Sequence, residues 1–273
     1  MVTTLLIAAT LGLTSPRVPN VVADITIDGR LDEAAWSDAL TVPLTFETRP
    51  GENIDPPVET DVLLIDTGTS LLVGFRARDP DPEAIRAFFR DRDAAYRDDM
   101  VGVVLDTFND ERRALQFFAN AYGAQMDMIN DDINGREDDS WDAIWDSAGR
   151  ITEDGYVVEM RIPLGMLACP SGQTSFGVSF SRDLKPEEYA VNWPPMPQHW
   201  EAEWMANWVG LELPVPKRRP QIMPYVLVEA ENGLRSPDIG VDVKHVLGDG
   251  STAVLTANPD FRNVEDVIDT IDF

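Results

Sequence analysis

The segment at residues 156–162 constrains the fold of this chain more than any other part of the sequence. Apolar side chains occupy every second position in it: Tyr156, Val158, Met160 and Ile162. A period of two is typical of a β-strand with one buried face, because successive side chains point to opposite faces of a sheet. We therefore predict a half-buried strand that turns Glu159 and Arg161 toward water. Pro163 has no amide hydrogen to donate, and it ends the strand.

Strand-like runs recur at short intervals, separated by Gly, Pro, Asn and Asp turn signals. They cover residues 60–66, 70–79, 99–106, 114–121, 124–129, 156–162, 176–182 and 205–211. Many short strands without alternating long helices favour an all-β, antiparallel sandwich, jelly-roll-like in character, over a parallel α/β sheet. Short helical turns are predicted at 31–36 and 82–90, the second with Pro82 near its first position.

The charge balance excludes several partners. The chain has 273 residues, with 22 basic and 48 acidic side chains, for a net charge of −26. Nucleic acid and anionic membrane surfaces would be repelled, and the sequence has no basic patch with interleaved aromatic residues. The acidity fits solubility, adaptation to salty surroundings or cation binding. Cys169 is the only cysteine, so an intramolecular disulfide is excluded.

Three segments organise the chain. Residues 1–23 contain an apolar run from Leu5 to Leu13 and are predicted to be a signal peptide, although a basic start is missing. Residues 24–213 hold most of the strand-like runs and form the predicted sandwich. Residues 214–273 begin with a Pro-rich, basic linker and continue with strand-like runs at 221–230, 240–246 and 251–257. Export to the periplasm, the outer membrane or the extracellular space is the expected localisation.

Two motifs carry a resemblance to a known family. The first runs from Ile27 to Trp36, IDGRLDEAAW, in which an Asp-Gly turn leads to a helical turn that ends in Trp. The second motif frames the strand predicted at residues 156–162, with Gly155-Tyr156 at its start and Ile162-Pro163-Leu164 at its end. Between these two motifs lie a strand-like segment at residues 98–106 and then a segment at residues 117–123, so that the four pieces form an ordered set along the chain. Together these segments resemble family 9 carbohydrate-binding modules and their DOMON-like relatives, over about residues 25–213.

The C-terminal remainder carries a second similarity. The segments at 242–244 and 255–265 resemble the entry into the β-barrel of large bacterial outer-membrane proteins in which such a sandwich precedes the barrel. This similarity implies association with the outer membrane through the C-terminal segment.

The family resemblance implies sugar binding without catalysis, with calcium as a structural ion and a polysaccharide or oligosaccharide as partner. Trp side chains offer large, rigid surfaces for stacking, and Trp36 matches the buried Trp of the family. The candidates for sugar stacking are Trp193, Trp200 and Trp204 on a Pro-rich loop, with Trp141 and Trp145 on one face of an extended segment. Covering an open end of the sandwich is an equally good interpretation of the loop.

An acidic run at residues 130–139 suggests a site for a hard cation such as calcium, which prefers clustered oxygen ligands. The candidate ligands are Asp131, Asp132, Asn134 and Asp139. An EF-hand is rejected, because its twelfth position is Trp141 and amphipathic flanking helices are absent. A solvated acidic turn is the alternative.

Enzymatic interpretations find little support in the sequence. It has two histidines, His199 and His245, and it lacks GxSxG, HExxH and phosphate-loop motifs. A haem-binding electron-transfer domain is a further alternative, with Met126, Met128 or Met196 as axial ligands, but CxxCH is absent. An envelope interaction domain without sugar binding is the other alternative.

Overall fold

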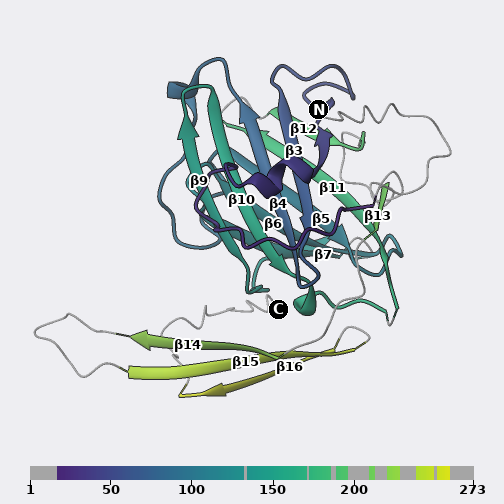
Figure 1. Ribbon diagram of the computed structural model, residues 1–273, viewed down its shortest axis with the longest axis vertical. Helices are drawn as coiled ribbons and strands as arrows, with labels where there is room; N and C mark the ends of the chain where they lie inside the picture. The colour runs from purple at the N-terminus through teal and green to yellow at the C-terminus, as the bar shows by residue number, and fades with distance from the viewer. Residues whose placement is uncertain are drawn as a thin grey trace, which may run out of the picture.

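The computed structural model describes residues 17–131, 134–170, 172–185, 189–195, 209–212, 220–227, 238–248 and 251–258. Antiparallel strands form nearly all of the regular structure, with three short 3-10 turns (Figure 1). The predicted all-β sandwich is confirmed. Within these described ranges, no helix is long and apolar enough to cross a membrane.

Two sheets form the sandwich. The smaller sheet has five strands in the order β1-β3-β4-β10-β9. Its strands are β1 (Leu40–Pro43), β3 (Thr60–Asp66), β4 (Ser70–Arg78), β10 (Gly155–Pro163) and β9 (Asp146–Thr152). The larger sheet has eight strands in the order β2-β12-β11-β5-β6-β7-β8, with β13 also paired to β11. Its strands are β2 (Phe46–Arg49), β12 (Tyr189–Trp193), β11 (Ser175–Leu184), β5 (Met100–Asp106), β6 (Arg113–Asn120), β7 (Gln125–Asp131), β8 (Arg136–Asp138) and β13 (Val209–Glu212).

The main core lies between the two sheets. The alternating residues of β10 reach it, as predicted, and Tyr156, Val158, Met160 and Ile162 are all buried. Facing residues of the larger sheet complete it, including Val101, Val103, Phe117, Val178 and Phe180. Alternation along each strand thus places one row of side chains in a common interior.

The outer face of the smaller sheet is also covered, and here one prediction from the sequence was wrong. Glu159 was expected to face water, but its side chain is fully buried. The N-terminal segment, including η1 (Ala34–Asp38), crosses this face, and Ile25 and Trp36 pack there against Leu72. Alternation identified correctly which side chains of β10 share each face, but it does not show what covers the outer face.

Glu159 binds the N-terminal segment directly. Its Oε2 accepts hydrogen bonds from the backbone N–H groups of Asp28 (2.9 Å), Gly29 (2.9 Å) and Arg30 (3.2 Å). Its Oε1 accepts one from Nε1 of Trp36 (3.2 Å). Burial raises the pKa of the Glu159 carboxyl, and the bonds from the three amides oppose that rise. The two sequence motifs that carried the family resemblance are therefore in contact through one carboxyl group.

Two glycines allow this contact. Gly29 has φ +80°, a conformation that favours glycine, at the turn that aims its amide at Glu159. Gly74 on β4 lies under the N-terminal segment. A Cβ atom at Gly74 would lie 2.5 Å from a side-chain carbon of Leu31 and 3.2 Å from the ring of Trp36. The close approach of the segment to the sheet requires both positions to lack a side chain.

A buried arginine joins the two sheets. Arg182 of β11 is fully buried, and its Nη2 donates to Asp79 (2.9 Å), just beyond β4. Its Nη1 donates to the carbonyl of Arg78 (2.6 Å) and to Thr60 of β3 (3.2 Å). The guanidinium also lies 5.2 Å from the ring centroid of Tyr156. Because these partners lie in the smaller sheet or directly beside it, Arg182 fixes how the sheets are positioned relative to each other.

The predicted helical turns are shorter in the structure than in the sequence analysis. The turn expected at 31–36 appears as η1, and the one expected at 82–90 is only η2 (Pro82–Ala84). Beyond η2 the helical turn does not continue, and the carboxylates of Asp98 and Asp99 accept the N–H groups of Phe88 and Arg86 (both 3.1 Å). These side chains replace the carbonyl acceptors that a helix would supply. A third turn, η3 (Leu164–Met166), follows β10.

The structure bears on where the predicted sandwich begins. Residues 1–16 of the predicted signal peptide lie outside the described residues. Val18 is buried in the main core, and the N–H of Val21 donates to the carbonyl of Asp66 (2.8 Å). Some residues before position 24 are therefore part of the sandwich.

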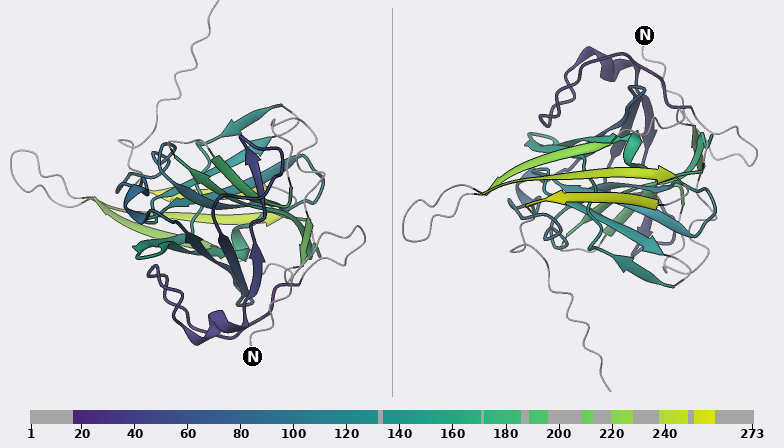
Figure 2. Two further views of the ribbon diagram at one scale, coloured as in Figure 1. Left: turned by 90° about the horizontal axis from the view of Figure 1, so that it is seen from above. Right: turned by 90° about the horizontal axis from the view of Figure 1, so that it is seen from below.

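A separate three-stranded sheet follows the sandwich, in the order β14-β15-β16. Its strands are β14 (Gln221–Leu227), β15 (Asp238–Gly248) and β16 (Ser251–Ala257). It lies beside the sandwich, and the view from below in Figure 2 shows it lying across the sandwich strands. Nζ of Lys244 donates to the carbonyl of Asp142 (2.8 Å), which connects the third sheet to the chain between β8 and β9.

Replacement of Glu159 tests its role in the fold. In Glu159→Ala, the indole and three backbone N–H groups lose their acceptor, and we expect the free energy of unfolding to fall by about 3–5 kcal/mol. Urea denaturation measures this change. The control is Glu153→Ala in the exposed β9–β10 turn, which should stay within about 0.5 kcal/mol of the unmodified protein. Equal losses in the two variants would contradict the assigned role.

Candidate functional site

The predicted sugar-stacking tryptophans occupy several different places. Trp193 was expected on a loop, but it is the last residue of β12, is 8% exposed, and stacks on Phe180 with ring centroids 6.1 Å apart. Trp145 is 5% exposed. The positions of these two rings suit packing rather than stacking on a ligand. Trp200 and Trp204 lie outside the described residues.

Trp141 and Trp145 lie on one side of their segment, as their spacing suggested. Both make edge contacts with Phe117 of β6, with ring centroids 5.9 and 5.5 Å apart. Trp141 is partly buried at the margin of the main core. Together the two rings close the side of the sandwich where the chain passes from β8 to β9.

Within the acidic run at 130–139, Asn130 and Asp131 end β7, and residues 134–139 form turns on either side of the short strand β8. Asp131 accepts hydrogen bonds from the backbone N–H (3.3 Å) and Nδ2 (2.9 Å) of Asn134, and it pairs with Arg113 at 3.2 Å. The contacts from Asn134 and Arg113 lower the pKa of Asp131. Asp139 accepts a hydrogen bond from the hydroxyl of Tyr96 (3.3 Å). Asp132 lies outside the described residues.

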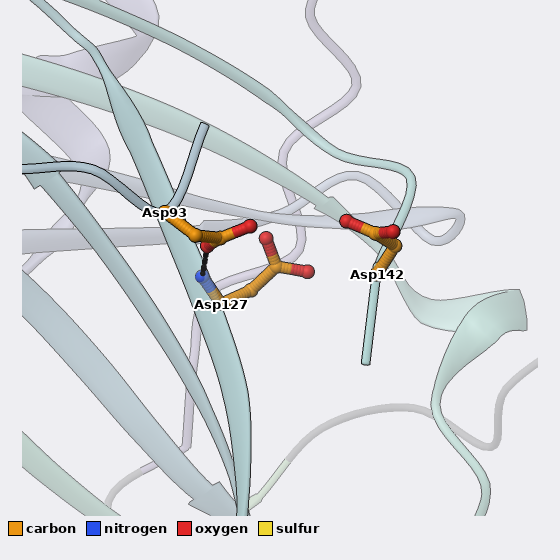
Figure 3. A group of neighbouring side chains, drawn as sticks. All are labelled: Asp93, Asp127 and Asp142. Carbon is orange, nitrogen blue, oxygen red and sulfur yellow. Dashed lines mark hydrogen bonds between the residues drawn. The ribbon is translucent and has the colours of Figure 1, made fainter. Parts of the chain in front are cut away.

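Three other carboxylates come together immediately beside this run. Asp93, Asp127 and Asp142 each offer an oxygen, and these oxygens lie within 4.8 Å of one another. Figure 3 shows Asp93 and Asp127 side by side, with Asp142 facing them from the chain after β8. We refer to these three residues as the carboxylate triad.

The end of strand pairing along β7 explains the position of the triad. β8 pairs only with residues 129–131 of β7, so the preceding part of that edge bonds to other groups. The N–H of Asp93 donates to the carbonyl of Gln125 (2.9 Å), and the carboxylate of Asp93 accepts the N–H of Asp127 (3.0 Å). The carboxylate of Asp127, on the inner face opposite Phe117, accepts the N–H of Ala143 (2.5 Å).

Arg92 partly neutralises the triad. Its Nη2 donates to Asp127 and to the carbonyl of Ala143. Its Nε lies 3.0 Å from an oxygen of Asp142 and 3.8 Å from one of Asp93. One guanidinium therefore faces three carboxylates, and a surplus of negative charge remains if all three are ionised.

The electrostatics of the triad reflect this surplus. Burial raises the pKa of Asp93 to about 6, and the charges of Asp127 and Asp142 add to the rise. Burial also raises the pKa of Asp127, against the effect of Ala143 and Arg92. Clustered carboxylate oxygens form a donor set that a hard cation such as Ca²⁺ prefers. The triad therefore fits a cation in chemistry, although Arg92 already occupies part of its surroundings.

A second buried polar group organises the chain between η2 and β5. Asp98 is fully buried and accepts hydrogen bonds from Nε (3.2 Å) and Nη2 (3.0 Å) of Arg90 and from Nδ2 of Asn120 (2.9 Å). Burial opposes the ionisation of Asp98, but these bonds and the one from the Phe88 amide outweigh it and lower its pKa. Asn120 also donates to the carbonyl of Phe88 (2.7 Å), and its Oδ1 accepts the N–H of Tyr122 (3.0 Å).

A polar cleft of about 550 Å³ lies beside Trp145, lined by Asp24, Ile25, Thr26, Ile27, Gln125, Asp146, Ser147 and Arg161. Several of its polar groups bind within the protein. Gln125 donates to the carbonyl of Trp145 (2.8 Å), and Arg161 donates to the carbonyl of Ile25 and pairs with Asp146 at 3.4 Å. These contacts hold the N-terminal segment and the chain before β9 in place.

Solved structures share this architecture. A putative carbohydrate-binding protein from Bacteroides uniformis matches with a TM-score of 0.54 and 17% sequence identity, over 72% of this chain and 98% of that one. This chain shares the β-sandwich fold of that protein. A family 9 carbohydrate-binding module from Caldicellulosiruptor kristjanssonii, solved with cellotriose and also with glucose, matches with a TM-score of 0.48 and 16% identity. Each match to that module covers 75% of this chain and at least 95% of the module.

No family model and no curated protein matches the sequence. The fold assignment therefore comes from structure, and it agrees with the resemblance that the motifs carried.

The carboxylate triad was not predicted from the sequence. Its members are 34 and 15 residues apart along the chain, and Asp93 and Asp142 lie in segments without regular structure. One signal was available, because Asp127 stands between Met126 and Met128 in a strand where both faces turn out to be buried. In an acidic chain, one such residue does not identify its partners.

Proposed function

We propose that this protein is a non-catalytic carbohydrate-binding domain of the bacterial cell envelope. The observation that carries the proposal is the family 9-like sandwich, a fold it shares with the Bacteroides protein described as a putative carbohydrate-binding protein. The exposed loops of such a scaffold are where recognition residues are usually found. Trp200 and Trp204 remain our candidates for stacking on sugar, whereas Trp193 and Trp145 belong to the packing of the sandwich.

Glycan binding by the full chain tests the proposal. We expect binding to at least one neutral oligosaccharide on a glycan array, followed by calorimetric titration with that oligosaccharide. Loss of a stacking ring in Trp200→Ala or Trp204→Ala should weaken binding about tenfold. No binding to any glycan on the array would reject the proposed function, and unchanged affinity in both variants would reject only the Trp assignment.

We also propose that the carboxylate triad holds a structural calcium ion. Asp93, Asp127 and Asp142 would supply oxygen ligands from three separate segments and so link them. Burial raises the pKa of Asp93, and calcium would offset the charges of Asp127 and Asp142 that add to this rise. This set replaces the acidic run as our preferred site, because Asp131 is engaged by Asn134 and Arg113.

Melting temperatures with calcium and with chelator test the ion. A carboxyl with a raised pKa destabilises the fold as pH rises through about 6, because ionisation is harder in the folded state. Calcium should therefore raise the melting temperature at pH 7.5, and this gain should shrink below pH 6 as Asp93 is protonated. Asp93→Asn should abolish the gain and Asp131→Asn should keep it. The opposite pattern would place the ion in the acidic run.

A second candidate function is membrane association through the third sheet. Residues that are paired across its strands share a face, because side chains alternate along each strand. One face carries Ile222, Pro224, Val226, Ile239, Val241, Val243, Leu255 and Ala257, with His245 as the polar exception among the described side chains of that face. Ile222, Val226, Ile239 and Leu255 are 60–70% exposed.

The other face of the third sheet is more polar. It carries Asp242, Lys244 and Thr256 beside Met223 and Val254, and Lys244 on this face contacts the sandwich. A sheet in water normally buries its apolar face against another layer. Four apolar side chains of the first face are exposed instead, which supports contact with membrane hydrocarbon and agrees with the sequence similarity to outer-membrane proteins.

Vesicle flotation with zwitterionic phosphatidylcholine tests this second function without a contribution from lipid charge. The full chain should float with the vesicles. Leu255→Asp should reduce the bound fraction about tenfold, because it places a charge on the apolar face. The matched control is Val254→Asp, one residue away on the opposite face, which should bind nearly normally. Equal effects of the two substitutions, or no flotation of the unmodified chain, would refute the assignment.

A further inference from the structure

A group of exposed aromatic rings lies at the end of the larger sheet. Phe88 is 53% exposed, Phe89 87% and Tyr122 37%. The rings of Phe89 and Tyr122 stack with centroids 4.7 Å apart and an interplanar angle of 17°. The guanidinium of Arg90 lies 5.0 Å from the ring centroid of Phe88. We call Phe88, Phe89 and Tyr122 the aromatic platform.

Buried hydrogen bonds hold the platform from beneath. The carboxylate of Asp98 accepts the N–H of Phe88 and binds Arg90 through two nitrogens. Asn120 bonds to Asp98, to the carbonyl of Phe88 and to the N–H of Tyr122. Asp98 and Asn120 are both fully buried. One polar pair therefore fixes the backbone on both sides of the stacked rings.

This support distinguishes the platform from aromatic residues exposed singly at a surface. Single exposed apolar side chains are common and need no explanation. Here the rings come from two segments about 30 residues apart, and the same two buried side chains position both segments. Rigid aromatic rings lose little conformational entropy on binding, and a fixed backbone lowers that loss further.

The chemistry around the rings favours a neutral sugar. Each planar ring can stack on the apolar C–H face of a pyranose. The exposed side chain of Asp91 offers acceptors for hydroxyl groups beside the rings. The net charge of −26 disfavours an anionic polymer. We propose that the aromatic platform is a stacking site for a neutral sugar ring, distinct from Trp200 and Trp204; this inference rests on the proposed function.

Calorimetric titration tests the platform, with a neutral oligosaccharide identified on the array as the probe. Phe89→Ala and Tyr122→Ala should each weaken binding about tenfold, which corresponds to about 1.4 kcal/mol. The matched control is Tyr96→Ala. Tyr96 is also an exposed aromatic residue, 45% exposed, but it bonds to Asp139 and should leave affinity unchanged. Affinity retained in both platform variants would overturn the inference, whereas no binding by the unmodified chain would reject the proposed function itself.

A second variant gives a readout that does not depend on loss of function. Phe89→Trp places a fluorescent ring on the platform, and its emission, after subtraction of the unmodified protein, should change on addition of the same oligosaccharide. A saturating ligand that leaves this emission unchanged would place the sugar elsewhere. Size-exclusion chromatography covers the alternative of self-association. A dimer that dissociates in Phe89→Ala, without any change in sugar affinity, would also overturn the inference.

Discussion

The carboxyl group of Glu159 is the interaction on which the rest of the sandwich depends. It accepts three backbone amides and the indole of Trp36, and so attaches the N-terminal segment to the outer face of the smaller sheet. That segment buries Ile25 and Trp36 against the sheet. Without the attachment, apolar side chains such as Leu72 would be exposed to water on an uncovered face. The N-terminal segment can therefore cover the apolar outer face only because a glutamate stands in the middle of β10.

Buried polar groups play the same part elsewhere in the structure. Arg182 fixes one sheet relative to the other, and Asp98 with Asn120 fixes the chain that carries the exposed rings. Each group binds several partners that are distant in the sequence, and leaving any partner unsatisfied in the interior would cost free energy. Such networks define positions more sharply than apolar packing does, which is the property that a rigid recognition surface requires.

Sequence patterns predicted the architecture well, but they did not show which distant side chains the fold brings together, for a physical reason. Alternation reports which side chains of β10 share a face, so the inward residues and the sandwich were predictable. It does not show what packs against the other face of β10, so Glu159 was predicted to face water. Phe88 lay in a predicted helical turn, because its segment has no internal pattern that shows its bonds to Asp98. The carboxylate triad and the aromatic platform each join segments that only the folded chain brings together. The motif containing Trp36 and the strand containing Glu159 were recognised as a pair, but their contact was not anticipated.

The most direct test of this account is amide hydrogen exchange at the turn of the N-terminal segment. If the carboxyl group of Glu159 attaches the segment, the amides of Asp28, Gly29 and Arg30 will exchange as slowly as those in the middle of β10, because they share one cooperative unit. These residues lie outside any strand, so slow exchange has no other source in their local backbone. Exchange at the rate of an exposed loop, with β10 still protected, would contradict the account.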